Sequence, residues 1–295
     1  MADILKGADV VDSINKKAIT QVEALKNKGV TAVLAIVRVG EKADDISYEK
    51  TAIKRCSAVG VAVKSIVLPE NVKQDELMQS IVELNNDDCV HGVLLFRPLP
   101  AHLSDEAVRL ILKPEKDIDG ITDASLAGVF TGSNNGFAPC TAEACMEILD
   151  HYNIDCKGKR AVIIGRSLVV GKPVAMMLMG RHATITVCHT RTADIEAIAR
   201  NAEILIVASG QSESITKDYL SEGQIVIDVG IHWNEEKGKL CGDVRFDEAE
   251  KIVAAITPVP GGVGTVTTSV LVSHVVQAAV KSTDNKEYLR HDFNR

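Results

Sequence analysis

Residues 161–173 read AVIIGRSLVVGKP and combine an aliphatic run with a glycine-rich turn and the start of a helix. Gly165 follows the aliphatic residues, and a residue without a side chain permits a tight turn. Pro173 suits the first turn of a helix, whose N–H groups lack helical partners and can hold a phosphate. The segment therefore predicts a strand–loop–helix unit for a nucleotide. A purely structural turn is the alternative, because the loop has neither P-loop spacing nor the G-x-G-x-x-G pattern.

Outward from this segment, short aliphatic runs alternate with stretches whose apolar residues recur at helical spacing. Such alternation predicts an α/β fold with parallel sheets and right-handed crossovers. The expected strands are 32–39, 62–68, 92–96, 161–165, 184–189, 204–208, 224–229 and 254–258. The expected helices are 43–59, 74–85, 171–179, 192–199, 247–252 and 267–279, besides a helical N-terminus. We expect the charged tail after Lys281 to fray.

Two domains are expected, because 295 residues exceed what one hydrophobic core usually absorbs. The stretch 113–136 is rich in Pro, Asp, Gly, Ser and Asn and interrupts the alternation, so we place a domain junction near it. The prediction is an N-terminal α/β domain over residues 1–140, completed by the helix 267–281. A C-terminal Rossmann-type domain with a parallel sheet is predicted over residues 141–266.

Composition excludes several classes of protein. The net charge of −7 gives no general attraction to nucleic acid. The sequence has no run of 18 apolar residues that could span a membrane, and its His and Cys residues do not have the spacing of a metal site. The seven cysteines include no C-x-x-C pair, which indicates reduced thiols and a cytoplasmic location.

The end of the second strand of the nucleotide unit bears on cofactor choice. In the usual dinucleotide fold an acidic residue there binds the ribose hydroxyls and disfavours a 2′-phosphate. Residues 188–192 read CHTRT and contain no acid. Arg166 and Arg191 are both suited to a 2′-phosphate, since guanidinium matches phosphate geometry. NADP is therefore favoured over NAD.

Several motifs occur in order: GRSLVVGKP (165–173), CHTRT (188–192), VIDVGI (226–231) and TPVPGGVG (257–264), preceded by KDIDG (116–120) and PCT (139–141). Together they resemble the methylenetetrahydrofolate dehydrogenase/methenyltetrahydrofolate cyclohydrolase family over about residues 3–280. The resemblance implies two α/β domains with a cleft between them, and commonly a homodimer. It also implies that the N-terminal domain carries most of the site for a tetrahydrofolate substrate and the C-terminal domain holds NAD(P).

The resemblance also implies roles for individual residues. Tyr48 and Asp119 become the candidate catalytic residues, and Asp119 would hold the pterin ring, whose edge is rich in N–H donors. A surface or capping carboxylate is the alternative for Asp119. Further substrate contacts are expected at Pro258, Gly261 and Gly262. Cofactor contacts are expected at Gly165, Arg166, Ser167, Gly171, Thr190, Arg191 and Ile231.

Two departures from the family pattern concern the cyclohydrolase reaction. That chemistry in the family relies on a Tyr-x-x-x-Lys helix and on a glutamine at a strand end. With Tyr48 matched, the place of the lysine holds Ala52 and the place of the glutamine holds Phe96. Lys50 and Lys54 share the helix face of Tyr48 poorly. Arg97 cannot act as a base, because guanidinium stays protonated.

These departures predict a dehydrogenase with weak or absent cyclohydrolase activity, because hydride transfer needs no general base whereas hydrolysis does. A fully bifunctional enzyme, in which Lys50, Lys54 or Arg97 replaces the lost lysine, is the nearest alternative. A catalytically inactive, nucleotide-binding regulatory protein is the alternative from another class.

Overall fold

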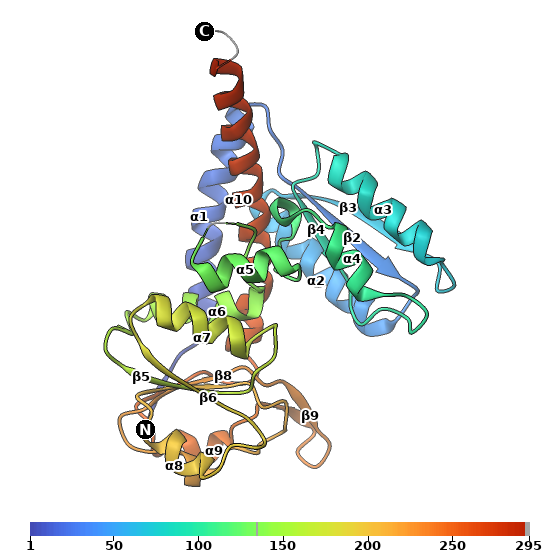
Figure 1. The fold of residues 1–295 in the computed structure, drawn as a ribbon. Helices are drawn as coiled ribbons and strands as arrows, with labels where there is room; N and C mark the ends of the chain where they lie inside the picture. Colours follow the sequence, from blue (N-terminus) through green and yellow to red (C-terminus); the bar gives the residue numbers. More distant parts are fainter. Residues whose placement is uncertain (134, 293–295) are drawn as a thin grey trace. The chain divides into compact units, whose positions relative to one another are not determined.

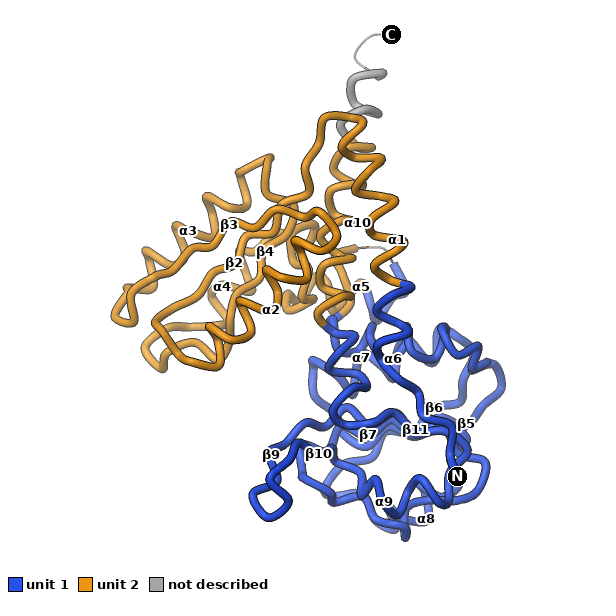
Figure 2. The backbone as a smooth tube through the Cα atoms, turned by 180° about the vertical axis from the view of Figure 1, so that it is seen from behind, with its two compact units in different colours: residues 1–13, 129–133, 139–267 blue, residues 14–128, 134–138, 268–295 orange. Residues whose placement is uncertain are grey.

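The computed structural model of the chain describes the backbone of residues 1–133 and 135–292, and the side chains through Asn285. Two compact units are present, shown in different colours in Figure 2. Unit 1 comprises residues 1–13, 129–133 and 139–267, and unit 2 comprises residues 14–128, 134–138 and 268–295. Each unit contains a parallel sheet covered by helices, so the predicted α/β class is confirmed.

Unit 1 contains a six-stranded sheet in the order β1-β11-β8-β7-β5-β6, with every neighbouring pair parallel. Its strands are β1 (Asp3–Ile4), β5 (Arg160–Ile164), β6 (Thr184–Cys188), β7 (Ile204–Val207), β8 (Ile225–Asp228) and β11 (Ala255–Ile256). An antiparallel hairpin of β9 (His232–Asn234) and β10 (Lys239–Cys241) follows β8. The carboxyl ends of β5, β6, β7 and β8 lie at one edge of the sheet, because these strands are parallel.

Helices cover both faces of this sheet, as the aliphatic strands require. On one side lie α6 (Cys140–His151) and α7 (Gly171–Gly180), and on the other lie α8 (Ile195–Arg200) and α9 (Phe246–Ala249) (Figure 1). Leu205 of β7 is buried in a cluster with Ala199 and Ala249 from the latter two helices. A short 3-10 helix, η2 (Lys217–Tyr219), lies beside α8.

Unit 2 contains a three-stranded parallel sheet in the order β3-β2-β4. Its strands are β2 (Val33–Val39), β3 (Ala62–Leu68) and β4 (Gly92–Leu95). Its helices are α2 (Ala43–Val59), α3 (Gln74–Asn86), α4 (Asp105–Ile111), η1 (Pro114–Lys116) and α5 (Asp123–Thr131). Alternate residues of β2 and β4 pack against Leu77 and Ile81 of α3, which follows from the two-residue period of a strand.

Two long helices have residues in both units. α1 (Gly7–Asn27) leaves unit 1 after Ser13, and α10 (Val263–Asp292) leaves it after Thr267. Their remaining parts run side by side in unit 2 (Figures 1 and 2). The span Val263–Asn285 of α10 is apolar and long enough to cross a membrane by composition, but 67% of the tested window is buried inside the protein. It is therefore a core helix.

The structure differs from the sequence predictions in several elements. Residues 1–13 were expected in the N-terminal domain, but β1 pairs with β11 and they lie in unit 1. The stretch expected as a junction holds η1 and α5, and α10 continues past Lys281, where fraying was expected.

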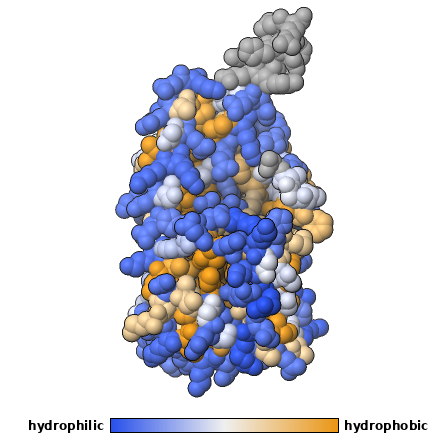
Figure 3. Space-filling model, turned by 90° about the vertical axis from the view of Figure 1, so that its left-hand side faces the viewer, coloured by the Kyte–Doolittle hydropathy of each residue, from blue (hydrophilic) through white to orange (hydrophobic). Residues whose placement is uncertain are grey.

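On the face drawn in Figure 3, hydrophobic side chains form patches among hydrophilic ones.

Candidate active site

The loop between β5 and α7 needs glycine at both of its ends. Gly165 has a φ of +124°, and a Cβ there would lie 2.2 Å from the carbonyl oxygen of Ala208. A Cβ on Gly171 would lie 2.2 Å from the carbonyl oxygen of Gly165. Ser167 shapes the turn between them, since its Oγ accepts a hydrogen bond from the N–H of Val170 at 3.1 Å. The loop is thus held close to the sheet while Arg166 and Ser167 remain exposed.

The end of β6 lies beside this loop, because β5 and β6 are parallel neighbours and the N–H of Gly165 donates to the carbonyl of Cys188 at 2.9 Å. His189 accepts at Nδ1 from the N–H of Arg191 at 3.1 Å, and its own N–H donates to Thr192 Oγ1 at 2.9 Å. Thr190 and Arg191 are exposed at this turn. In the described part of the chain neither Arg166 nor Arg191 forms a salt bridge, so both guanidinium groups are available to an anion.

Ile231 lies just beyond the end of β8 and is 60% exposed. Two buried carboxylates hold the loop that presents it. Asp228 accepts hydrogen bonds from the N–H groups of Gly230, Asp243 and Val244 at 2.9–3.0 Å. Burial raises the pKa of Asp228 to about 7.

Asp243, which is fully buried, ties further segments to the same edge of the sheet. Its Oδ2 accepts from the N–H of Gly210 at 2.9 Å, and its Oδ1 lies 2.7 Å from His232 Nε2. The sequence prediction missed both Asp228 and Asp243. An acid at the end of a buried strand was the available signal for Asp228, whereas nothing in the sequence linked it to Asp243.

The segment after β11 carries Pro258, Gly261 and Gly262. A Cβ on Gly262 would lie 2.5 Å from the carbonyl oxygen of Pro258, and Gly261 has a φ of +103°. The N–H of Gly7 donates to the carbonyl of Gly261 at 2.7 Å. The chain's own backbone thus accounts for these two glycines, and their predicted role in substrate binding stays a prediction.

In unit 2, Tyr48 lies on α2 and Phe96 directly follows β4. Their rings meet edge to face with centroids 5.6 Å apart. Tyr48 is 38% exposed, whereas Phe96 is buried and Ala52 has no exposed surface. The places expected to hold a lysine and a glutamine are therefore filled by packed apolar groups.

The lysines closest to Tyr48 in the sequence do not lie on the same face of α2 as Tyr48. At 3.6 residues per turn, Ala52 lies about 40° from Tyr48 around α2, while Lys54 lies about 120° and Lys50 about 160° away. Both lysines are exposed. Arg97 has its Nη1 3.5 Å from Asp105 Oδ2. The structure therefore places none of these three cationic side chains where the family pattern has its lysine, which is position 52 here.

The motif KDIDG divides into structural and accessible residues. Lys116 Nζ donates to the carbonyls of Leu84 and Asp87, both at 2.7 Å. Asp117 is fully buried and accepts from the N–H groups of Ile121 and Thr122 and from the hydroxyl of Ser125. These three hydrogen bonds measure 3.0, 2.8 and 2.7 Å. Asp119 is only partly buried, so it is the carboxylate of the motif that a ligand can reach.

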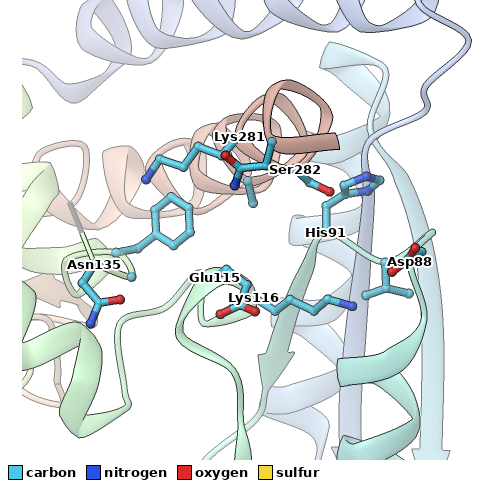
Figure 4. A pocket seen from close by; sticks show the side chains of 12 residues that line it. Asp88, His91, Glu115, Lys116, Asn135, Lys281 and Ser282 are labelled. Carbon is cyan, nitrogen blue, oxygen red and sulfur yellow. The ribbon is translucent and has the colours of Figure 1, made fainter. Parts of the chain in front are cut away.

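Unit 2 also contains a cavity of about 380 Å³ (Figure 4). His91 and Lys116 line it, and Lys281 lies above the ring of Phe137 with its Nζ 4.6 Å from the centroid. His91 precedes β4, whereas Phe96 follows it, so the cavity lies at the opposite end of the strand from Tyr48. None of the predicted site residues lines it. Within the described residues, no group of three His, Cys, Asp or Glu side chains could hold a metal ion.

Glycine-lined loops at the carboxyl edge of a parallel sheet define an α/β dinucleotide-binding protein. The family model for the catalytic domain of tetrahydrofolate dehydrogenase/cyclohydrolase matches residues 5–119. The model for the NAD(P)-binding domain of the same enzymes matches residues 139–283. The chain therefore belongs to the tetrahydrofolate dehydrogenase/cyclohydrolase family, and the predicted resemblance is confirmed.

Individual relatives agree along almost the whole chain. The bifunctional protein FolD of Clostridioides difficile (strain 630) is 44% identical over 283 residues, which is 96% of this chain and 98% of the relative. The crystal structure of the bifunctional enzyme FolD from Campylobacter jejuni is 38% identical with a TM-score of 0.92, covering 95% of this chain and 99% of that one. The methylenetetrahydrofolate dehydrogenase-cyclohydrolase of Trypanosoma brucei, solved with NADP and an inhibitor, is 34% identical with a TM-score of 0.88, covering 96% and 98%.

Proposed function

We propose that this protein oxidises methylenetetrahydrofolate with NADP as the preferred acceptor and hydrolyses the methenyl product weakly or not at all. Membership of the family and its NAD(P)-binding domain support the dehydrogenase reaction. Hydride transfer requires the reactive carbon to lie against the nicotinamide ring, and it needs no general base. The glycine loops of unit 1 would hold the dinucleotide, and Tyr48 and Asp119 would hold the folate.

One observation carries the proposed loss of hydrolysis, namely the apolar packing of Ala52 and Phe96 beside Tyr48. Hydrolysis of a methenyl group needs an activated water and a titratable side chain to move the proton. A methyl group and a phenyl ring supply neither. Losing such an acid–base partner typically lowers a rate about 10²–10⁴-fold.

A second candidate is the fully bifunctional enzyme, and the comparisons favour it. The relatives from Clostridioides difficile and Campylobacter jejuni, which are 44% and 38% identical, are both named as bifunctional proteins. In that case a cation other than a lysine at position 52 would take part in hydrolysis, with Lys50, Lys54 and Arg97 as the candidates. The third reading, an inactive regulatory protein, would be excluded by any turnover.

The preference for NADP rests on the exposed side chains of Arg166 and Arg191 at the ends of two neighbouring strands. A 2′-phosphate would meet two guanidinium groups there and no carboxylate at the end of β6. The relative from Trypanosoma brucei, solved with NADP, is consistent with this choice.

The decisive experiment follows the methenyl absorbance after methylenetetrahydrofolate oxidation, in a buffer where spontaneous hydrolysis is slow. We expect the signal to persist with the wild-type protein. Enzyme-dependent decay that Lys50→Met or Lys54→Met abolishes would show that a displaced lysine acts and that the bifunctional candidate is correct.

A matched variant tests the same idea by gain of activity. Restoring the family residues with Ala52→Lys and Phe96→Gln together should accelerate decay of the methenyl signal while oxidation continues. Because position 52 is fully buried, folding of the variant is checked by circular dichroism. A folded variant without added hydrolysis would show that other residues limit the reaction.

We also infer a homodimer in the cytoplasm. None of the seven cysteines, all of which lie in the described part of the chain, forms a disulfide bond, and reduced thiols are typical of a reducing compartment. The inference of a homodimer is based on the family resemblance alone. Light scattering of the purified protein measures the mass directly, and a monomeric mass at micromolar concentration would contradict it.

A further inference from the structure

We infer that Arg38 and Glu49 form a positioning pair that fixes Tyr48 for folate turnover, an inference that rests on the proposed function. Arg38 Nε donates to Glu49 Oε2 at 3.0 Å, and the two side chains are only 9% and 10% exposed. Arg38 Nη1 also donates to the carbonyl oxygen of Gly40. One guanidinium therefore joins the end of β2, the following loop and the helix that carries Tyr48.

The start of α2 has no buried side chain to anchor it, although Lys42 Nζ at the N-cap donates to the carbonyl of Pro98 at 3.3 Å. Residues 43–48 contribute no buried side chain, and Lys42 at the N-cap forms no side-chain capping hydrogen bond. Glu49 is the first buried residue of the helix, and Ala52, Cys56 and Val59 follow on the same face. The ion pair is therefore the first buried contact along the helix, one residue after Tyr48.

The aromatic contact fixes a different part of Tyr48. Phe96 restrains the ring from the side of β4, with the centroids 5.6 Å apart. The ion pair restrains the backbone from the side of β2. With both in place the phenol has a defined position, although 38% of the residue is exposed.

Stability alone is a poor reason for this ion pair. Two charges lose their hydration on burial, and replacing a buried pair by apolar residues of similar volume is often neutral or stabilising. Arg38 is the only charged residue of β2, and Glu49 is the only charged residue among the buried residues of α2. A guanidinium, however, fixes direction through its planar fork in a way that apolar packing does not.

The test compares single and double replacements. Arg38→Met or Glu49→Leu alone leaves a buried charge without its partner and should lower the melting temperature. The double variant removes both charges and should melt close to the wild-type temperature. If the pair positions Tyr48, the double variant should still lose about 10- to 100-fold in kcat/KM for methylenetetrahydrofolate, with an unchanged Kd for NADP.

Two further variants separate positioning from general damage. In a Tyr48→Ala background, removing the pair should cost little more, because the pair acts through Tyr48. Arg38→Lys keeps the charge and should recover part of the activity. Lys64→Met breaks the solvent-accessible ion pair between Lys64 on β3 and Asp87 at the end of α3 (3.0 Å) and serves as the control, which should leave kcat/KM unchanged.

Hydrogen exchange provides a readout that does not depend on turnover. Amides of residues 46–49 should exchange at least about 10-fold faster in the double variant, while those of residues 56–59 keep their rates. Wild-type kcat/KM in the double variant, or additive effects with Tyr48→Ala, would overturn the inference. A wild-type protein without folate turnover would instead contradict the proposed function, and the exchange rates would still test the pair.

Discussion

Two aspartates only two residues apart show how position decides the role of a carboxylate. Asp117 is fully buried and satisfies two backbone N–H groups and a hydroxyl, so it holds the loop before α5. Asp119 is partly exposed in the same loop. The sequence predicted a ligand contact for Asp119, with a capping role as the alternative. In the structure the hydrogen bonds that hold this loop are made by Asp117.

We predict that Asp119→Ala loses folate turnover and keeps dinucleotide binding. Loss of a charge-assisted hydrogen bond to the pterin costs about 1.5–3 kcal/mol, which is roughly 10- to 100-fold in kcat/KM. Steady-state kinetics and a separate NADP titration measure the two effects. Asp117→Ala is the contrasting variant, because it leaves buried donors without an acceptor and should lower the free energy of unfolding by about 3 kcal/mol. Near-wild-type folate kinetics in Asp119→Ala would refute its assigned role.

A second prediction concerns Arg166 and Arg191. Replacing both by Ser should weaken NADP selectively and leave the KM for NAD almost unchanged, because only NADP carries the 2′-phosphate. Initial rates with each cofactor give the ratio of kcat/KM values. A wild-type preference for NAD of about tenfold or more would show that the two arginines serve another purpose.

Single residues with a local cause were predictable from the sequence. Gly171 belongs to this group, because a Cβ there would meet the carbonyl of Gly165 in the same turn, whereas the close approach of Ala208 to Gly165 comes from a neighbouring strand. The buried carboxylates Asp228 and Asp243 were not predictable, because the sheet brings them together from positions 15 residues apart. Arg38 and Glu49 likewise lacked a signal, since neither periodicity nor a motif indicates that two charges will meet in a core.

At the scale of elements, predictability followed length. The seven-residue strands β2 and β3 were long enough for their aliphatic character to stand out. The two-residue strand β1 was not, and its partner β11 lies about 250 residues further along the chain. The three-residue strands of the β9–β10 hairpin are too short for an alternating pattern.

The helix α10 carries a titratable group that should make stability depend on pH. His274 is buried, its Nδ1 donates to the carbonyl of Ile118 at 2.8 Å, and burial lowers its pKa from 6.5 to about 4. As the pH falls below 6.5 the unfolded chain takes up a proton that the folded protein refuses until about pH 4. The contribution of His274 to the free energy of unfolding is therefore fully present above pH 6.5. It is lost as the pH falls towards 4, which lowers the free energy of unfolding by about 3 kcal/mol.

The variant His274→Asn tests this dependence, because an amide can donate to Ile118 but does not titrate in this range. Urea unfolding between pH 4 and 7 should show a smaller acid-induced loss in the variant than in the wild type. Equal slopes in the two proteins would assign the acid sensitivity to other groups.

For the whole molecule, the predicted division into one domain of residues 1–140 with 267–281 and another of residues 141–266 stays a prediction, apart from residues 1–13, which lie in unit 1. This division has a measurable consequence if the dinucleotide binds only the domain of residues 141–266. At 100 times its Kd, NADP should stabilise the binding unit by about 2.7 kcal/mol. Hydrogen exchange should then slow in β5 and β7, with β2 and β4 unchanged. Equal protection of both sheets would indicate one cooperative unit.

The hairpin that follows Ile231 gives the protein a built-in optical probe. Trp233 is the single tryptophan of the chain, lies on β9 and is 58% exposed. Its emission therefore comes from one place, two residues from a proposed dinucleotide contact. A reduced nicotinamide ring absorbs light in the range that indole emits, so energy transfer to a bound reduced cofactor would quench this one fluorophore. Cofactor binding and release can thus be followed in the unlabelled protein, independently of any turnover.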